Sequence, residues 1–298
     1  MTEQAIVLTS PPGASALNAG AVDAFALGIG AVINWLAPHE AAHIVLRPDA
    51  DVAETIADAR DRFSGNPVDV NAITPVANLG LRRRLLVADM ESTIIEQECL
   101  DELADYAGVR ERIAGITERA MRGELDFEAA LRERVGLLAG LDARILQEIY
   151  DERVTLMAGA ATLIATMQAN GATCALVSGG FSFYTERIAA RLGFDTQQAN
   201  TLDVADDKIS GTVAAPILGR EAKRAALERL AGEKLIDLAA TLAVGDGAND
   251  LDMLAAAGLG VAFRAKPIVA DKAAVSVVHG DLTALLYLQG YRREEFIL

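Results

Sequence analysis

Asp89 and Glu91 are two carboxylates separated by one residue, and they follow directly on the apolar run at residues 85–88. Carboxylates placed in this way can divide the work of a displacement reaction, because one can attack while the other handles the proton of the leaving group. Short acidic strings are also common in solvated loops. The pair alone therefore does not establish a catalytic site.

Asp246 and Asp250 form a second acidic pair, again just after an apolar run, at residues 239–244. Glycines on both sides of Asp246 allow a sharp turn, and two carboxylates suit a hard cation such as Mg²⁺. A third apolar run ends in Ser178-Gly179-Gly180, which offers a hydroxyl and backbone N–H groups. This segment indicates either an anion site at the start of a helix or a helix start alone.

Three strand ends with complementary groups together indicate phosphoryl transfer, in which carboxylates attack and hold a metal while N–H, hydroxyl and amine groups hold phosphate. Parallel strands bring such ends to one edge of a sheet. The pattern predicts an α/β fold with a doubly wound, Rossmann-like parallel sheet. Its expected strands are residues 85–88, 173–177, 239–244, 260–263 and 275–278, and its expected helices include 160–169, 185–192 and 222–230.

Two further parts surround this sheet. About seventy residues of helical pattern separate the first two strands, and we expect residues 98–153 to form a helical cap above the strand ends. A β-hairpin is expected between residues 200 and 213. The first 80 residues predict a small α+β, ferredoxin-like (βαββαβ) domain ahead of the domain at 81–298. Its expected strands are 5–8, 32–36, 43–46 and 68–73, with helices at 16–29 and 51–63.

Composition limits the function classes. The formal net charge is −15, and aromatic residues make up only 5% of the chain, which argues against nucleic-acid and membrane partners. The two cysteines, Cys99 and Cys174, show no metal or redox spacing. We see no signal peptide and no apolar run of about 20 residues, so we expect a cytoplasmic protein. The sequence leaves open whether it forms a homodimer.

From about residue 85 to the C-terminus, the chain resembles the haloacid dehalogenase superfamily and, within it, the phosphoserine phosphatases. The resemblance includes motifs outside the three strand ends. These are residues 98–104, Met121-Arg122-Gly123, Phe127, Leu131 to Val135, Val177 to Phe181, Ala222-Lys223 and Val244 to Asp250. It implies hydrolysis of phosphoserine, a small phosphomonoester, as the last step of serine biosynthesis.

The resemblance also implies roles for the acids. Asp89 would attack phosphorus and form an aspartyl-phosphate, while Glu91 would serve as general acid and base. The implied cofactor is Mg²⁺. It would be held by Asp89, the backbone carbonyl of Glu91 and Asp246, with Asp250 bound directly or through water.

Substrate-binding roles are implied for nine further residues. Ser178, Gly179, Gly180 and Lys223 would hold the phosphoryl group, and Asn249 would steady the metal-side loop. In the cap, Glu98 would accept the substrate ammonium and Arg134 would bind its carboxylate. Met121 and Phe127 would close the site to water. Taken singly, each cap residue also fits a solvated helix charge or a core side chain.

Glu91 departs from the family pattern, which has aspartate at this position. The extra methylene moves the carboxyl group by about 1.5 Å, and a misplacement of about 1 Å can cost about 10²-fold in rate. Two alternatives therefore stay open: a phosphoserine:homoserine phosphotransferase, and a catalytically impaired amino-acid-binding regulator. The N-terminal domain loosely resembles amino-acid-binding regulatory domains, and a structural or dimer-forming role is equally compatible with its pattern.

Overall fold

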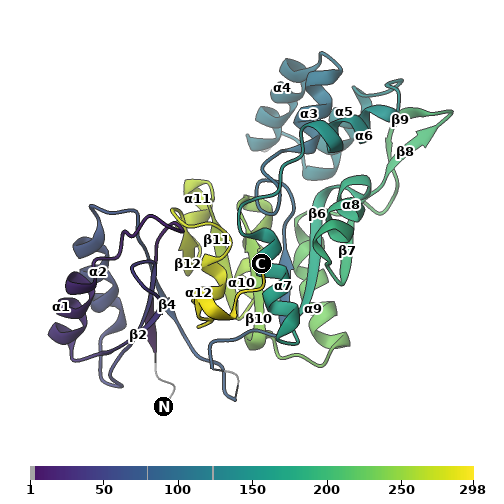
Figure 1. The fold of residues 1–298 in the computed structure, drawn as a ribbon. Coiled ribbons are helices and arrows are strands. Elements are labelled where there is room, and N and C mark those ends of the chain that lie inside the picture. Colours follow the sequence, from purple (N-terminus) through teal and green to yellow (C-terminus); the bar gives the residue numbers. More distant parts are fainter. Residues whose placement is uncertain (1–3, 79, 123) are drawn as a thin grey trace.

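A computed structural model describes residues 4–78, 80–122 and 124–298 of the chain. Its central feature is a six-stranded sheet in the order β12-β11-β10-β5-β6-β7, in which every neighbouring pair is parallel (Figure 1). The strands are β5 Leu85–Ala88, β6 Thr173–Phe181, β7 Thr196–Asn200, β10 Thr241–Gly245, β11 Leu259–Phe263 and β12 Val275–Val277. The predicted parallel sheet is confirmed.

Helices cover both faces of this sheet, because alternate residues of each strand point to opposite sides. In β5, Leu86 and Ala88 pack with α7, α8 and α12, whereas Leu85 and Val87 pack with α9, α10 and α11. These helices are α7 Ala160–Ala169, α8 Ser182–Leu192, α9 Arg220–Glu233, α10 Leu251–Ala256, α11 Pro267–Ala270 and α12 Ala284–Leu288. Short 3-10 turns are η1 Leu238–Ala240, η2 Ala248–Asp250 and η3 Arg293–Glu295. The doubly wound fold is thus confirmed.

The strand order fixes where a site can form. From β5 the chain crosses first to β6 on one side, and later to β10 on the other side. The connections leave the carboxyl ends of β5, β6 and β10 side by side at this change of direction, which is where open α/β sheets bind ligands.

A cap stands at that end of the sheet. It contains α3 Cys99–Tyr106, α4 Arg110–Met121, α5 Phe127–Gly136 and α6 Arg144–Glu152. The hairpin of β8 Leu202–Ala205 and β9 Lys208–Val213 also belongs to it, since β9 lies beside α5 and its first residue, Lys208, pairs with Asp142 just before α6 (Figure 1). Asp206 and Asp207 form the hairpin turn with φ of 51° and 58°. The sequence predicted the hairpin but not its place on the cap.

Residues 4–73 form what we call the N-terminal unit. Its elements are β1 Ala5–Thr9, α1 Ala19–Ile29, β2 Val32–Ala37, β3 Ala41–Val45, α2 Val52–Phe63 and β4 Asp69–Ile73. The sheet is antiparallel in the order β2-β3-β1-β4, which confirms the ferredoxin-like plan. Helix α1 begins later than predicted because Asn18 caps it, its Oδ1 accepting from Ala21 N at 3.1 Å.

The sheet of the N-terminal unit lies between its own two helices and the parallel-sheet unit (Figure 1). Asn71 reaches the edge strand β12, where its side chain accepts from Ser276 N and donates to Ser276 O, both at 2.9 Å. The Asp69 carboxylate accepts from the backbone N–H groups of residues 278–280. Side chains of β4 therefore satisfy backbone groups at an edge that would otherwise be free to pair.

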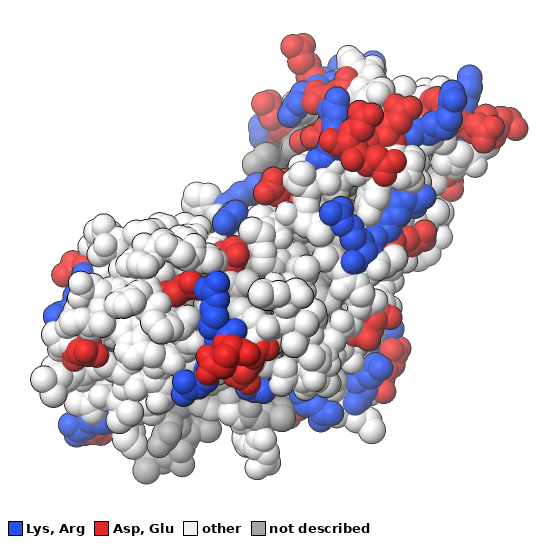
Figure 2. Space-filling view, viewed as in Figure 1, with Lys and Arg blue, Asp and Glu red and all other residues white. Residues whose placement is uncertain are grey.

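Charged side chains are unevenly distributed over the surface. Red and blue residues are interleaved over the cap, while mostly uncharged residues cover the N-terminal unit in the view of Figure 2. Across the described residues, we find no helix with the length and apolar character needed to span a bilayer.

Candidate active site

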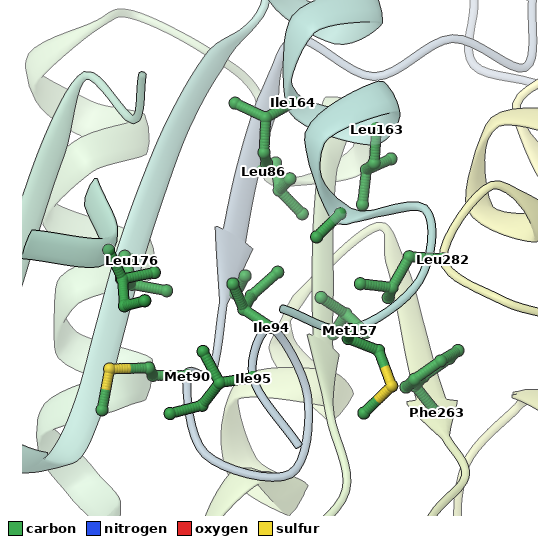
Figure 3. Packing of buried hydrophobic residues seen from close by; sticks show 14 of the residues in the cluster. Leu86, Met90, Ile94, Ile95, Met157, Leu163, Ile164, Leu176, Phe263 and Leu282 are labelled. Carbon is green, nitrogen blue, oxygen red and sulfur yellow. The ribbon is translucent and has the colours of Figure 1, made fainter. Parts of the chain in front are cut away.

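Asp89 is the first residue beyond β5, and its position is fixed by strand pairing and by the buried loop that follows it. Its backbone N–H donates to Val244 O at 3.0 Å, which extends the pairing of β5 with β10 by one residue. The loop that follows is anchored by Met90, Ile94 and Ile95, which are fully buried in the core (Figure 3). The Asp89 side chain therefore projects from a rigid base at the carboxyl end of the sheet.

Three carboxylates meet at this point. Asp89, Asp246 and Asp250 each offer an oxygen, and these atoms lie within 4.8 Å of one another. Asp250 is held in place because its Oδ2 accepts from Gly247 N at 3.0 Å. A Cβ at position 245 would lie 2.4 Å from Asp250 Cγ, so only glycine fits at the end of β10. The predicted acids of the two strand ends are thus brought together.

Lys223 supplies a positive charge in the same cluster. Its Nζ lies 2.7 Å from Asp89 Oδ1 and 2.6 Å from Asp250 Oδ1. The side chain extends from α9 and is buried, with 2% of its surface exposed. Burial by itself would lower the pKa of Lys223, but the two carboxylates outweigh it and raise that pKa, so the ammonium is stable here.

The carboxylates still outnumber the ammonium. Burial and the neighbouring Asp250 raise the pKa of Asp89 well above its usual value, against the opposing effect of Lys223. The same two causes raise the pKa of Asp246 to about 6. A divalent cation between these oxygens would relieve the repulsion, and carboxylate oxygens are the ligands that hard cations prefer. The acids present therefore suit a metal ion.

Glu91 points toward the cap. Its Oε1 accepts from Cys99 N, the first residue of α3, at 2.8 Å. A Cβ at position 180 would lie 2.7 Å from Glu91 Oε2, so the longer side chain uses the space that Gly180 leaves. Burial, followed by the nearby Glu98 charge, raises the pKa of Glu91 to about 7. The carboxyl group can therefore exist in both protonation states at neutral pH.

Ser178, Gly179 and Gly180 form the loop for which the sequence predicts phosphate binding. They belong to the last part of β6, and α8 begins only at Ser182, so they do not stand at a helix start as expected. Ser178 is buried, and its Oγ accepts from Gly180 N at 2.9 Å. The strand continues because its edge partner β7 pairs with it as far as Phe181.

The cap touches this loop through Phe127, the first residue of α5. A Cβ on Gly179 would come within 3.4 Å of Phe127 Cζ, and one on Gly219 within 3.2 Å of Cδ1. The ring therefore lies over the loop, as expected for a residue that excludes water. Asn200, which the sequence did not single out, holds the loop from below. Its side chain donates to Gly179 O at 2.8 Å and accepts from Leu218 N at 2.7 Å.

Glu98 and Arg134 line one cavity of about 450 Å³. Glu98 is exposed and accepts from Ser92 Oγ at 2.9 Å, while Arg134 is half-buried and donates to Ala130 O of its own helix. Burial lowers the pKa of Arg134, and the nearby acids, Glu98 among them, oppose this effect. The lining of the cavity thus includes a carboxylate and a guanidinium.

The sequence missed other residues of this cavity. Lys266 reaches it from the loop after β11, and its charge opposes the rise in the pKa of Asp246, so it connects the cavity with the acidic cluster. Its place three residues after the end of an apolar strand was the available signal. The remaining lining residues that were not singled out are Asp101, Arg110, Ala114, Thr117 and Glu118.

Two predicted residues remain. Asn249 lies in η2 and folds back on the metal-side loop, since a Cβ on Gly247 would be 2.2 Å from its Oδ1. Its expected role in steadying this loop stays a prediction. The side chain of Met121 lies outside the described part of the structure, so its expected place over the site stays a prediction.

Comparisons with known proteins agree with this architecture. The phosphoserine phosphatase of Streptomyces coelicolor is 47% identical over 223 residues, which are 74% of this chain and 54% of that protein. A haloacid dehalogenase family hydrolase from Salmonella enterica serovar Typhi has a TM-score of 0.82 at 28% identity, over 96% of this chain and 98% of that chain. A probable phosphoserine phosphatase from Vibrio cholerae has a TM-score of 0.79 at 33% identity, covering 97% and 86% of the two chains.

The chain spans about half the length of the Streptomyces relative. A family model for haloacid dehalogenase-like hydrolases matches residues 86–255, which include the three strand ends and the four cap helices. The chain therefore belongs to the haloacid dehalogenase-like hydrolase family.

Proposed function

We propose that the protein is a Mg²⁺-dependent phosphoserine phosphatase that works through an aspartyl-phosphate on Asp89. The observation that carries the proposal is the buried contact of Lys223 with Asp89 and Asp250, beside a cavity that contains Glu98 and Arg134. Two of the similar proteins above are described as phosphoserine phosphatases, one of them as probable. The phosphoryl group and the amino-acid part of the substrate would then each have a binding partner.

In the first half-reaction, an Asp89 oxygen attacks phosphorus and the bond from phosphorus to the seryl oxygen breaks. Glu91 in its acid form gives its proton to the leaving alkoxide, so free serine is released. A pKa raised to about 7 supports this role, because enough of the acid form is present at neutral pH. The loop of Ser178 and Gly179, together with Lys223, would bind the phosphoryl oxygens as charge develops.

In the second half-reaction, Glu91 is a carboxylate and takes a proton from water. The water oxygen attacks phosphorus, the bond from phosphorus to Asp89 breaks, and inorganic phosphate leaves. The proton accepted here is the one that the next cycle donates, so Glu91 returns to its starting state. Phe127 over Gly179 supports exclusion of other water during the first step.

We infer Mg²⁺ as the metal because the donors are all hard oxygens and one substrate partner is a phosphate. Asp89, Asp246 and Asp250 would hold it, with the carbonyl of Glu91 completing the protein ligands. When bound, the ion would neutralise charge on the phosphoryl oxygens. Lys223 would orient Asp89 for attack and, together with the bound ion, would favour its ionised form.

The cavity supports an amino acid as the leaving part. Glu98 would bind the ammonium group and Arg134 the carboxylate, where a guanidinium offers a bidentate match. For the chain as a whole, we propose a division at residues 1–80 and 81–298, with a cap at about 98–153 and a cytoplasmic location. The contacts of Asn71 and Asp69 with residues 276–280 support a structural role for the first part.

Phosphate release from L-phosphoserine in the presence of Mg²⁺ tests the proposal. The wild-type chain should release phosphate, and Asp89→Asn should lower the rate by at least about 10³-fold, because the amide is not a nucleophile. Absence of release by the wild-type protein, or undiminished release by the variant, would refute it. Added homoserine separates hydrolysis from transfer, since a hydrolase forms no phosphohomoserine.

A further inference from the structure

A second cavity lies at the opposite end of the parallel sheet from the acidic cluster. It has a volume of about 270 Å³ and is bordered by β4 of the N-terminal unit, by the turn from α10 to β11 and by the segment before β12. Arg83, which precedes β5, also lines it. Because these are the amino ends of β5, β11 and β12, the cavity is separate from the proposed active site.

Arg83 is the unusual residue of this cavity. Only 3% of its surface is exposed, and its guanidinium donates to the backbone carbonyls of Thr74, Leu81 and Arg82. Among the described residues, its Nε has no acceptor and no carboxylate forms a salt bridge with it. These hydrogen bonds hold the segment between β4 and β5 in place, but a carbonyl oxygen carries no full negative charge. A buried cation in this state is unfavourable unless an anion approaches it.

The remaining lining indicates what kind of anion would fit. Lys272 is the second charged residue of the wall, and no described acid lines it, although the chain has a net charge of −15. The other walls are mainly small or aliphatic, including Leu254, Ala255 and Ala257. The volume lies just below the range of about 300–1,000 Å³ that is typical of ligand pockets. A short aliphatic body with one negative end matches these walls.

We propose that this cavity binds a small aliphatic carboxylate, with the carboxylate at Arg83 and Lys272 and the aliphatic part against α10 and the turn to β11. The proposal does not depend on the catalytic function. Because the walls come from both the N-terminal unit and the parallel-sheet unit, binding would hold the two together and raise the unfolding temperature of the whole chain.

Calorimetric titration and thermal unfolding of the full chain at low ionic strength test this proposal. The probes are propionate and lactate, with neutral propionamide and inorganic phosphate as comparisons. We expect saturable binding of the carboxylates, a rise in unfolding temperature, and neither effect with propionamide. Equal responses to propionate and propionamide, or a response to phosphate alone, would overturn the proposal.

Three variants test whether the carboxylate binds in this cavity. Lys272→Ala should weaken carboxylate affinity by about fivefold, since the lysine is exposed and an exposed ion pair is worth at most about 1 kcal/mol. Ala255→Leu should abolish binding by filling the cavity without removing a charge. Arg83→Gln should abolish it as well, and the first two variants decide the matter if this one does not fold.

Matched controls separate this cavity from the active site. Lys208→Ala removes an exposed lysine of the cap hairpin, and Arg134→Gln removes the guanidinium of the cap cavity. Both should bind propionate as the wild type does. Loss of binding in Arg134→Gln with full binding in Lys272→Ala would assign the carboxylate to the active site and overturn the proposal.

Discussion

The acidic cluster and the cap cavity of the site are held in different ways. In the cluster, Asp89, Lys223 and Asp250 are at most 4% exposed and joined by contacts of 2.6–2.7 Å. In the cap cavity, Glu98 is exposed and, among the described residues, Arg134 bonds only to a carbonyl of its own helix, at 3.2 Å. The first group is in place before a substrate arrives, whereas the second can still adjust to it.

The difference assigns separate tasks to the two regions. Preorganised charges stabilise a transition state because they need not reorient during the reaction. Side chains that adjust on binding contribute mainly to affinity and selectivity. We therefore expect changes in the acidic cluster to lower kcat and the stability of the fold, and changes in the cap cavity to raise KM.

Lys223→Met should have the largest effect. Methionine fills similar space but leaves Asp89 and Asp250 without their counter-charge, so we expect kcat to fall by about 10²–10³-fold. The free energy of unfolding in metal-free buffer should fall by about 3 kcal/mol, as when one partner of a buried ion pair is removed. Steady-state kinetics and urea unfolding measure the two quantities. Lys208→Met, on the exposed cap hairpin, is the control and should change neither; an unaltered kcat in Lys223→Met would refute the division of tasks.

Gly180→Ala tests the space that Glu91 occupies. The new Cβ would lie 2.7 Å from Glu91 Oε2 and displace the carboxyl group. A shift of about 1 Å costs about 10²-fold, so we expect kcat to fall by that factor. Gly232→Ala is the control, since no atom lies within 4 Å of its added Cβ. If kcat in Gly180→Ala matches that of Gly232→Ala, the position of Glu91 does not govern proton transfer.

Arg134→Gln should affect affinity more than rate. Loss of the guanidinium removes the proposed carboxylate partner, and we expect KM for L-phosphoserine to rise about tenfold or more, with a smaller change in kcat. Arg132→Gln is a matched control on the same helix, because Arg132 is exposed and pairs with Glu128. Equal KM values for the two variants would remove Arg134 from substrate recognition.

The smallest expected effect is a shift in unfolding temperature with Mg²⁺ that depends on pH. Asp246 has a pKa raised to about 6, above the usual 3.8, so its ionisation disfavours the folded state increasingly as pH rises between these values. Mg²⁺ binds the ionised form, so its stabilisation should decline as the pH falls through about 6. We expect a rise of several degrees at pH 7.5 and much less at pH 5. A rise that is equal at both pH values would contradict the proposed ligands.

The sequence predicted the three acids of the cluster because they lie within a few positions of buried strand ends, whereas Lys223, in α9, followed only from the family resemblance. Asp89 and Asp246 follow apolar runs whose strands pair in parallel, so their proximity follows from topology. Asn200 was missed for the opposite reason. It contacts Gly179 and Leu218, which are about twenty residues away on either side, and no local pattern marks such a contact.

The local sequence pattern also could not predict how distant parts of the chain pack against one another. The hairpin was predicted, but its place beside α5 depends on Gly211, where an added Cβ would come within 2.7 Å of Ala139. Asn71 and Asp69 read as ordinary polar residues of a strand, yet they bond to residues about two hundred positions later. Periodicity fixes which face of a strand is buried, but not which distant surface covers it.

Detection of a phosphorylated Asp89 tests the central claim most directly. The full chain with Mg²⁺ is mixed with L-phosphoserine, quenched in acid during turnover and digested with pepsin at the same low pH, at which an acyl phosphate survives. Fragmentation of the peptide that contains Asp89 should place one phosphoryl group on Asp89, and the same peptide from Asp89→Asn should carry none. Turnover without a phosphoryl group on Asp89, or with one on Ser92 or Thr93 instead, would contradict the proposed mechanism.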